Sequence, residues 1–194
     1  MENLPPATIR KANAGDIDGI MKIERLSFHS EVVESKKVFE DRIAVFPDGF
    51  LIAEIETKGG KIIAGYVSSE LWPYSEAIPY SNFSLNHSIY ETHSNDGDEL
   101  YISSFAVDPS VRGGKIGKHL FTALIDCVSK KYKLKSAILM VSSDWQNAYK
   151  MYQKEGFAAV SKISGFFPAS ENSGSEDDLS SAGIIMKKCL INNY

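Results

Sequence analysis

A glycine-rich turn carries the residue types in this chain that best suit chemistry. Residues 106–120 read AVDPSVRGGKIGKHL, with three glycines and three cations ahead of a helical pattern. The first backbone N–H groups of a helix have no intrahelical partner, and the helix dipole makes this end attractive to anions. Glycines let an anion approach such a backbone closely. The turn therefore predicts an anion site built from these residues: Arg112, Gly113, Gly114, Lys115, Gly117 and Lys118.

Two common phosphate-binding motifs do not fit this turn. A Walker loop needs G-x-x-x-x-G-K-[ST], but His119 follows Gly117 and Lys118, and no glycine lies five residues before Gly117. A dinucleotide fingerprint needs G-x-G-x-x-G in the first crossover of the chain, and Gly114-x-x-Gly117 lacks the leading glycine pair. A glycine-rich connection with incidental basic residues remains the alternative.

The elements around the turn predict a parallel crossover. ELYISSFAV at 99–107 is typical of a strand, and Ile116, Leu120, Leu124 and Val128 form an apolar stripe at helical spacing. SAILMV at 136–141 is a continuous apolar run, which suits a strand buried on both faces. Strand, helix and strand in this order place the turn where the first strand meets the helix.

The N-terminal part predicts two helices and a hairpin. A strand at 7–12 precedes a helix that starts at the signal Asn13-x-x-Asp16, and a second helix covers 35–45. Apolar strands at 49–56 and 61–72 flank a glycine turn as a hairpin.

The remaining segments predict a long loop, a helix and two strands. The aromatic-rich segment 73–98 has no clear period and can form a binding wall or cover the sheet edge. Ser143-x-x-Gln146 has capping-box form ahead of a helix that ends at Gly156. Strands at 158–167 and 183–191 then flank an acidic, serine-rich loop.

Composition limits the classes of partner. The chain has 194 residues, 43% of them hydrophobic, and a formal net charge of -4, which fits a globular protein and argues against nucleic-acid binding. No apolar run reaches the roughly 20 residues that span a bilayer, and the N-terminus lacks the apolar core of a signal peptide, so we expect no membrane partner and a cytoplasmic location. The histidines and the two cysteines, Cys127 and Cys189, show no metal spacing, and we expect both cysteines to be reduced and buried.

The glycine-rich turn and a second motif downstream of it resemble two motifs that occur in the same order in the GNAT acyltransferases, which use acetyl-CoA. Their turn has the form [Q/R]-x-x-G-x-[G/A] after a strand ending in L-x-V-x-P. Here FAVDP at 105–109 is similar to that ending, Arg112 and Gly117 match the outer positions, and Lys115 replaces the middle glycine. The downstream signature A-x-x-x-Y-x-x-x-G-F is matched by Ala148, Tyr152, Gly156 and Phe157.

The resemblance covers nearly the whole chain and implies its fold. IMKIERLSF, FPDGFLIAE and SSELW look most like the arylalkylamine N-acetyltransferase branch and its microbial relatives. A mixed α/β fold is implied, with a central, mostly antiparallel sheet, one parallel β-α-β crossover and flanking helices. We expect residues 1–194 to form a single N-acetyltransferase domain that is a monomer or a homodimer.

The resemblance also assigns acetyl-CoA to the turn. The Phe105 backbone would polarise the acetyl carbonyl, and Val107, next to Ala106, would bind the pantetheine arm. Asn147 would contact the cofactor from the next helix, where Trp145 stands at a position that many relatives fill with asparagine. The pyrophosphate would be surrounded by the turn, that is by Val111, Arg112, Gly113, Gly114, Lys115, Ile116, Gly117 and Lys118.

Acid and base roles follow from the same comparison. Tyr152 matches the family tyrosine that protonates the CoA sulfur, although an aromatic on an apolar helix face can also be plain core. Relatives carry a base at the positions of Tyr101 and Ser103, and neither residue is a good base at neutral pH. Because strand side chains alternate, Glu99 shares their side, and we expect a water chain past Ser103 and Tyr101 to Glu99, unless Glu99 is only a surface carboxylate.

Three functions are compatible with this sequence. The first is acetyl transfer to a primary amine of a small molecule by direct attack in a ternary complex. The second is acetylation of a peptide or protein N-terminus, which uses the same cofactor site and an open groove. The third is a non-catalytic sensor of acyl-CoA.

Overall fold

Seven strands form one mixed sheet in the computed structural model, which describes residues 6–113, 115–168 and 180–190. Their order across the sheet is β1-β2-β3-β4-β5-β7-β6. The strands are β1 (Thr8–Lys11), β2 (Phe50–Thr57), β3 (Gly60–Trp72), β4 (Glu99–Val107), β5 (Ser136–Ser142), β6 (Ala158–Pro168) and β7 (Ser180–Cys189). The helices are α1 (Ile17–Ser27), α2 (Lys36–Val45), α3 (Ile89–Thr92), α4 (Ile116–Ser129) and α5 (Gln146–Lys154).

The predicted crossover is confirmed. β4 and β5 pair in parallel, α4 connects them, and the other strand pairs among the described residues are antiparallel. The glycine-rich turn joins the carboxyl end of β4 to the start of α4, as the sequence predicts. The mixed α/β fold with one parallel unit and flanking helices is therefore the fold of this chain.

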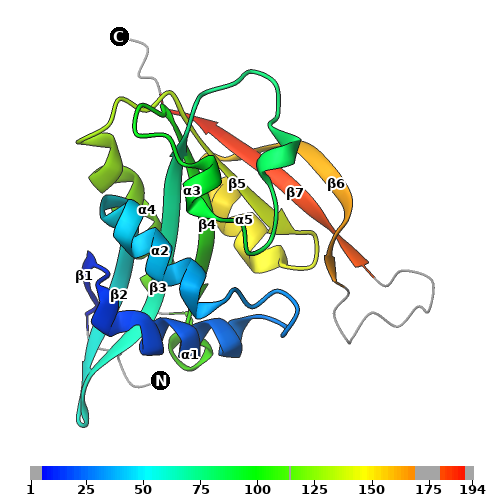
Figure 1. Cartoon of the computed structure of the whole chain (residues 1–194). Helices are drawn as coiled ribbons and strands as arrows, with labels where there is room; N and C mark the ends of the chain where they lie inside the picture. Colours follow the sequence, from blue (N-terminus) through cyan, green and yellow to red (C-terminus); the bar gives the residue numbers. More distant parts are fainter. Residues whose placement is uncertain (1–5, 114, 169–179, 191–194) are drawn as a thin grey trace.

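Helices cover both faces of the sheet. α4 packs on one face, where Leu120, Phe121 and Leu124 meet apolar residues of the central strands. α1 and α2 cover the other face, where Ile20 and Phe39 pack with Tyr66 of β3. Figure 1 shows α1 and α2 in front of β2, β3 and β4, and β6 and β7 extending away from β1.

Local capping signals explain where α1 and α2 begin and where α5 ends. Asn13 and Asp16 form the predicted capping box, here on a short 3-10 turn (Ala14–Asp16) that leads into α1. Ser35 caps α2 through its side chain. Gly156, with φ of 87°, lies just after α5.

Three expectations need correction. α5 starts at Gln146 with Trp145 as its cap, so Gln146 is the first helical residue and cannot complete a capping box with Ser143. β7 begins earlier than predicted, and Ile191 lies outside the described residues together with the acidic segment 171–178. Cys189 is exposed and Cys127 partly buried; both are free thiols.

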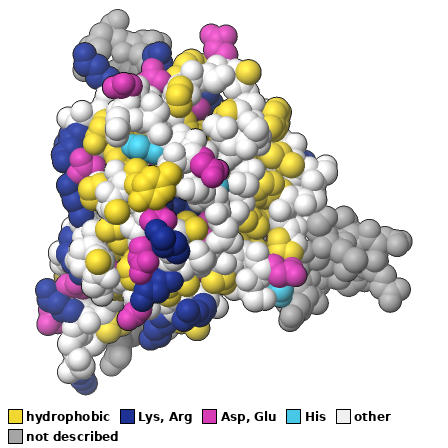
Figure 2. Space-filling model, in the orientation of Figure 1, with side chains coloured by type: hydrophobic (Ala, Val, Ile, Leu, Met, Phe, Trp, Pro, Cys, Tyr) yellow, Lys and Arg dark blue, Asp and Glu magenta, His cyan; other side chains and the backbone are white. Residues whose placement is uncertain are grey.

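No helix in the described part of the chain is both long and apolar enough to cross a membrane. The face formed by α1 and α2 carries Lys and Arg side chains interspersed with Asp and Glu (Figure 2).

Candidate functional site

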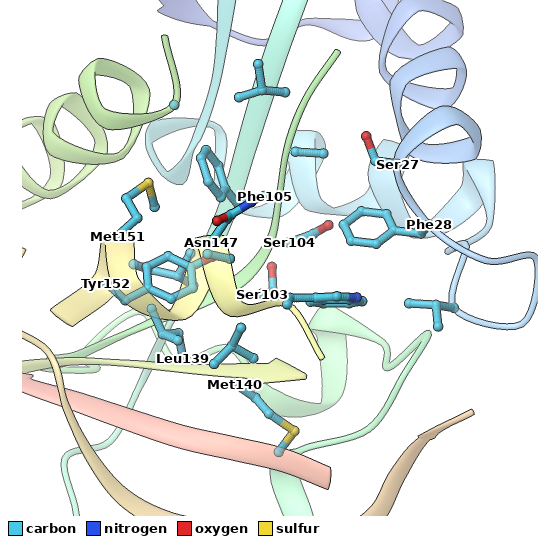
Figure 3. A pocket seen from close by; sticks show the side chains of 18 of the residues that line it. Ser27, Phe28, Ser103, Ser104, Phe105, Leu139, Met140, Asn147, Met151 and Tyr152 are labelled. Carbon is cyan, nitrogen blue, oxygen red and sulfur yellow. The ribbon is translucent and has the colours of Figure 1, made fainter. Parts of the chain in front are cut away.

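The site arises where β4 and β5 part. Their parallel pairing runs from Glu99↔Ser136 to Ile102↔Leu139 and ends there. The edge of residues 103–107 that faces β5 therefore has no strand partner, although backbone N–H and C=O groups are obligatory hydrogen-bonding groups. A cavity of about 870 Å³ opens between the two strands. It reaches from the glycine-rich turn to the carboxyl end of α1 (Figure 3).

A β-bulge at Ser103 shapes the wall of this cavity. Ser104 pairs with Ser68 and Ile102 with Ser69, so Ser103 has no opposing residue on β3. A bulge of this kind shifts the alternation of side chains by one position. Ser103 and Ser104 consequently both contact side chains on the α1 side of β3, while Phe105 returns to the α4 side, where it packs near Phe121.

The turn half of the cavity is lined by most of the predicted anion-binding residues. Arg112 donates from Nε to the Val107 carbonyl at 3.0 Å and from a terminal nitrogen to Ser27 Oγ at 3.2 Å, which fixes its guanidinium between β4 and α1. Gly113 has φ of 91°. The other predicted cofactor residues that line the cavity are Phe105, Ala106, Val107, Val111, Lys115, Ile116, Gly117, Asn147 and Tyr152.

Lys115 caps α4 in the left-handed region, with φ of 64°. A side chain in this conformation brings its Cβ close to the following carbonyl oxygen, a cost that glycine does not have. This backbone shape explains why a glycine suits the middle position of the turn and identifies Lys115 as a strained departure from that pattern.

Not every predicted residue lies at the cavity. Lys118 points to Glu155, with which it forms an ion pair at 3.2 Å, and does not line the cavity. Gly114 lies outside the described residues. Glu99 is fully buried away from the lining, where its carboxylate accepts from Ser136 Oγ and pairs with Lys187 Nζ, each at 2.6 Å. Because Glu99 does not border the cavity, its position does not support the expected water chain from the amine to this carboxylate.

Tyr152 projects from α5 beside Phe105, with ring centroids 6.4 Å apart. It is 7% exposed, and burial raises the pKa of its phenol, so the hydroxyl stays protonated at neutral pH. Within the described residues this hydroxyl makes no hydrogen bond. Figure 3 shows Tyr152 and Met151 on one side of the cavity, Phe28 on the other, and Ser103 and Ser104 between them. Tyr152 can therefore donate a proton into the cavity.

The opposite half of the cavity contains buried carboxylates, and we call it the carboxylate half. Its lining includes Glu24 of α1 and Glu34 of the segment between α1 and α2. Glu24 accepts hydrogen bonds from the Tyr66 hydroxyl and, at 3.1 Å, from the Glu34 backbone N–H. Glu34 forms a two-pronged ion pair with the fully buried Arg42. Glu34 is thus neutralised locally, whereas Glu24 has only neutral donors.

Tyr101 and His87 complete this half of the cavity. Tyr101 stacks on Trp72 with ring centroids 3.9 Å apart, and burial raises the pKa of its phenol. His87 contacts the Ser84 carbonyl through Nδ1 at 3.2 Å and Glu70 through Nε2 at 3.1 Å. Glu70 does not line the cavity and also accepts from Trp72 and Thr92.

Burial raises the pKa of Glu24 to about 7, which the hydrogen bonds from Tyr66 and the Glu34 backbone only partly oppose. A carboxyl that titrates near neutrality and borders a cavity is suited to exchange protons there. Glu24 is absent from the sequence-based candidates. A signal was available, because helical spacing places Glu24 seven residues after Ile17 on the apolar face of α1.

An aromatic bridge closes one side of the cavity. Phe28, which caps α1, lies 5.1 Å from Trp145, and Trp145 lies 5.0 Å from Phe167 of β6, measured between ring centroids. These three rings link the α1 side of the cavity to the α5 and β6 side. Trp145 thus forms part of the cavity wall.

Among the described residues, no group of three or more His, Cys, Asp or Glu side chains is placed to hold a metal ion.

Structural relatives share this fold at low identity. Ard1 from Thermoplasma volcanium is 20% identical with a TM-score of 0.67, covering 96% of this chain and 99% of its own. The loading GNATL domain of CurA from Lyngbya majuscula is 12% identical with a TM-score of 0.75, covering 95% and 98%. The ribosomal-protein-S18-alanine N-acetyltransferase from Escherichia coli is 18% identical with a TM-score of 0.65, covering 97% of both chains.

Comparison at the level of sequence gives the family. No curated protein matches the chain. The model of the acetyltransferase (GNAT) family matches residues 17–157, a range that runs from the start of α1 to the end of the tyrosine signature. The chain therefore belongs to the acetyltransferase (GNAT) family, whose acyl donor is acetyl-CoA.

Proposed function

We propose that this protein transfers the acetyl group of acetyl-CoA to a primary amine of a small molecule by direct attack in a ternary complex. The aromatic bridge of Phe28, Trp145 and Phe167 is the observation that carries the choice of a small acceptor. An extended peptide needs an open groove between α1 and β6, and these three rings span that space. In the carboxylate half, the ionised form of Glu24 would favour a cationic amine.

The residues of the turn half fit coenzyme A. The free edge of residues 103–107 can pair with the amides of a pantetheine arm as an added strand would. A Cβ at Gly117 would lie 3.2 Å from the Phe105 ring, so glycine lets the start of α4 lie close to β4. Arg112 can contact a pyrophosphate by charge-assisted hydrogen bonds, and the start of α4 offers backbone N–H groups.

Bound acetyl-CoA would supply an activated thioester. In our proposal the Phe105 backbone polarises its carbonyl, and the Tyr152 hydroxyl gives a proton to the departing sulfur. The amine nitrogen forms the new C–N bond as the C–S bond breaks. Val107 and Asn147 hold the arm, and the turn residues hold the phosphates.

Peptide N-terminal acetylation is the second candidate. It is favoured by the relative that acts on the alanine of ribosomal protein S18. None of the three structural relatives is an arylalkylamine acetyltransferase. The similarity to that branch is therefore supported by the sequence motifs and by the aromatic walls of the cavity.

A panel assay separates these functions. Thiol release from acetyl-CoA is followed with 2-phenylethylamine, a polyamine and short peptides, and thermal shift is measured with CoA, ATP and NAD. We expect turnover with the small amines and stabilisation by CoA. Peptide turnover alone would favour the second candidate, CoA stabilisation with no turnover would favour a sensor, and stabilisation by ATP or NAD alone would refute the cofactor assignment.

A further inference from the structure

We propose that Glu24 is the final acceptor of the proton that the acceptor amine loses, and that Ser104 and Tyr66 relay this proton to it. The inference rests on the proposed function, because a primary amine is an ammonium ion at neutral pH and attacks only after deprotonation. The relay is a chain of three side chains on three elements: Ser104 on β4, Tyr66 on β3 and Glu24 on α1.

The direction of the hydrogen bonds supports the relay. Tyr66 donates its hydroxyl hydrogen to Glu24 Oε2. The oxygen of Tyr66 lies 3.0 Å from Ser104 Oγ, and because the Tyr66 hydrogen is already committed, Ser104 is the donor in that contact. Ser104 lines the cavity next to Phe105, and its hydroxyl oxygen can also accept a hydrogen bond from a group bound in the cavity.

The neighbouring serine lacks such a path. Ser103 also lines the cavity, and its Oγ lies 2.9 Å from Ser68 Oγ. Ser68 in turn accepts from Arg42 at 3.5 Å, and a guanidinium in a protein stays protonated. A proton passed along Ser103 and Ser68 therefore meets a cation and no base.

The other titratable groups of the cavity are already committed. Both ring nitrogens of His87 are engaged within the protein, Nδ1 with the Ser84 carbonyl at 3.2 Å and Nε2 with the Glu70 carboxylate at 3.1 Å. Glu34 is held by Arg42. Glu24 remains as the cavity carboxylate without a cationic partner among the described residues.

Three charged or titratable groups face Glu24: Glu34 from the α1–α2 segment, Arg42 from α2 and Tyr66 from β3. Glu34 raises the pKa of Glu24, and Tyr66 and Arg42 lower it, but burial dominates and brings it to about 7. Glu24 can therefore bind and release a proton in the physiological range.

The proton step balances. One proton leaves the ammonium nitrogen for Ser104 Oγ, the Ser104 hydroxyl proton passes to Tyr66, and the Tyr66 proton passes to Glu24 Oε2. The products are a neutral amine and a protonated Glu24. After the C–N bond forms and the C–S bond breaks, Tyr152 has given its proton to sulfur, the nitrogen loses a second proton that restores the Tyr152 hydroxyl, and Glu24 returns its proton to solvent.

The test compares the pH dependence of kcat/KM for acetylation of 2-phenylethylamine by the wild type, Glu24→Gln, Ser104→Ala and the matched control Ser103→Ala. We expect the wild type and the control to lose activity as pH falls through about 7. Glu24→Gln and Ser104→Ala should lose this limb, so that kcat/KM rises up to the pKa of the amine, about 10. Near neutral pH the loss in Glu24→Gln should be about 100-fold or more, and it should shrink at alkaline pH.

A second readout needs no turnover. Carbon-13 NMR of glutamate carboxyls in the ligand-free wild type should show a carboxyl that titrates near pH 7 and is missing in Glu24→Gln. If no amine is acetylated by the wild type, the proposed function fails, and this titration still tests the ionisation of Glu24. The inference is overturned by a pH-independent loss in Glu24→Gln, by loss of the limb in Ser103→Ala as well, or by the absence of the near-neutral titration.

Discussion

Replacing Glu24 with Gln should change how the stability of the protein depends on pH. Burial raises the pKa of Glu24 from 4.5 to about 7. An acid with a raised pKa in the folded state contributes stability that is fully present below its unfolded pKa and is lost as pH rises through the folded pKa. The wild type should therefore lose stability between about pH 4.5 and 7 through this one group.

The size of the effect follows from the shift. About 2.5 pKa units at 1.36 kcal/mol per unit correspond to about 3 kcal/mol. Gln cannot ionise, so Glu24→Gln lacks this loss. The unfolding free energy of Glu24→Gln minus that of the wild type should therefore be about 3 kcal/mol larger at mildly alkaline pH than at acidic pH. Other groups titrate alike in both proteins and cancel in the difference.

Urea denaturation across this pH range measures the difference. Glu91→Gln is a matched control, because Glu91 lies on α3 with an exposed side chain. Its stability curve should run parallel to that of the wild type. Parallel curves for Glu24→Gln and the wild type would refute the assignment of a near-neutral pKa to Glu24.

Three further changes test other parts of the site. Tyr152→Phe should lower turnover by about 100-fold or more while the dissociation constant for CoA stays nearly unchanged, and equal activity would remove Tyr152 from the mechanism. Lys115→Gly should raise the unfolding free energy by up to about 1 kcal/mol, because the left-handed backbone loses its Cβ, whereas Lys115→Ala should give no such gain; calorimetry showing equal stability of both variants would contradict this reasoning. Arg42→Met should cost about 3–5 kcal/mol in denaturant unfolding by leaving Glu34 buried and unpaired, and adding Glu34→Gln should recover part of it; a cost below about 1 kcal/mol would argue against the buried ion pair.

Much of the frame was predictable because it depends on local signals. Asn13 and Asp16 identify the entry to α1, Ser35 caps α2, and Gly156 lies just after α5. The apolar run of β5 and the stripe of α4 predict the parallel crossover and hence the position of the turn. Capping and periodicity act over a few residues, so one sequence reveals them.

The proton-accepting part of the site was not predictable in this way. Glu24 and Tyr66 are 42 residues apart and meet only because α1 packs across β3. The bulge at Ser103 depends on how β4 pairs with β3, and strict alternation gives no hint of the extra residue. Alternation does place Glu99 on the same side as Tyr101, but Lys187 from a distant strand captures its carboxylate.

Product analysis is the most direct test of acetyl transfer to a small amine. The protein is incubated with acetyl-CoA, 2-phenylethylamine and an equimolar short peptide with a free N-terminus, and mass spectrometry identifies what carries the acetyl group. We expect N-acetylated 2-phenylethylamine with little acetylated peptide, and far less of this product with Tyr152→Phe. Acetylation of the peptide alone, or of neither acceptor, would contradict the proposed function.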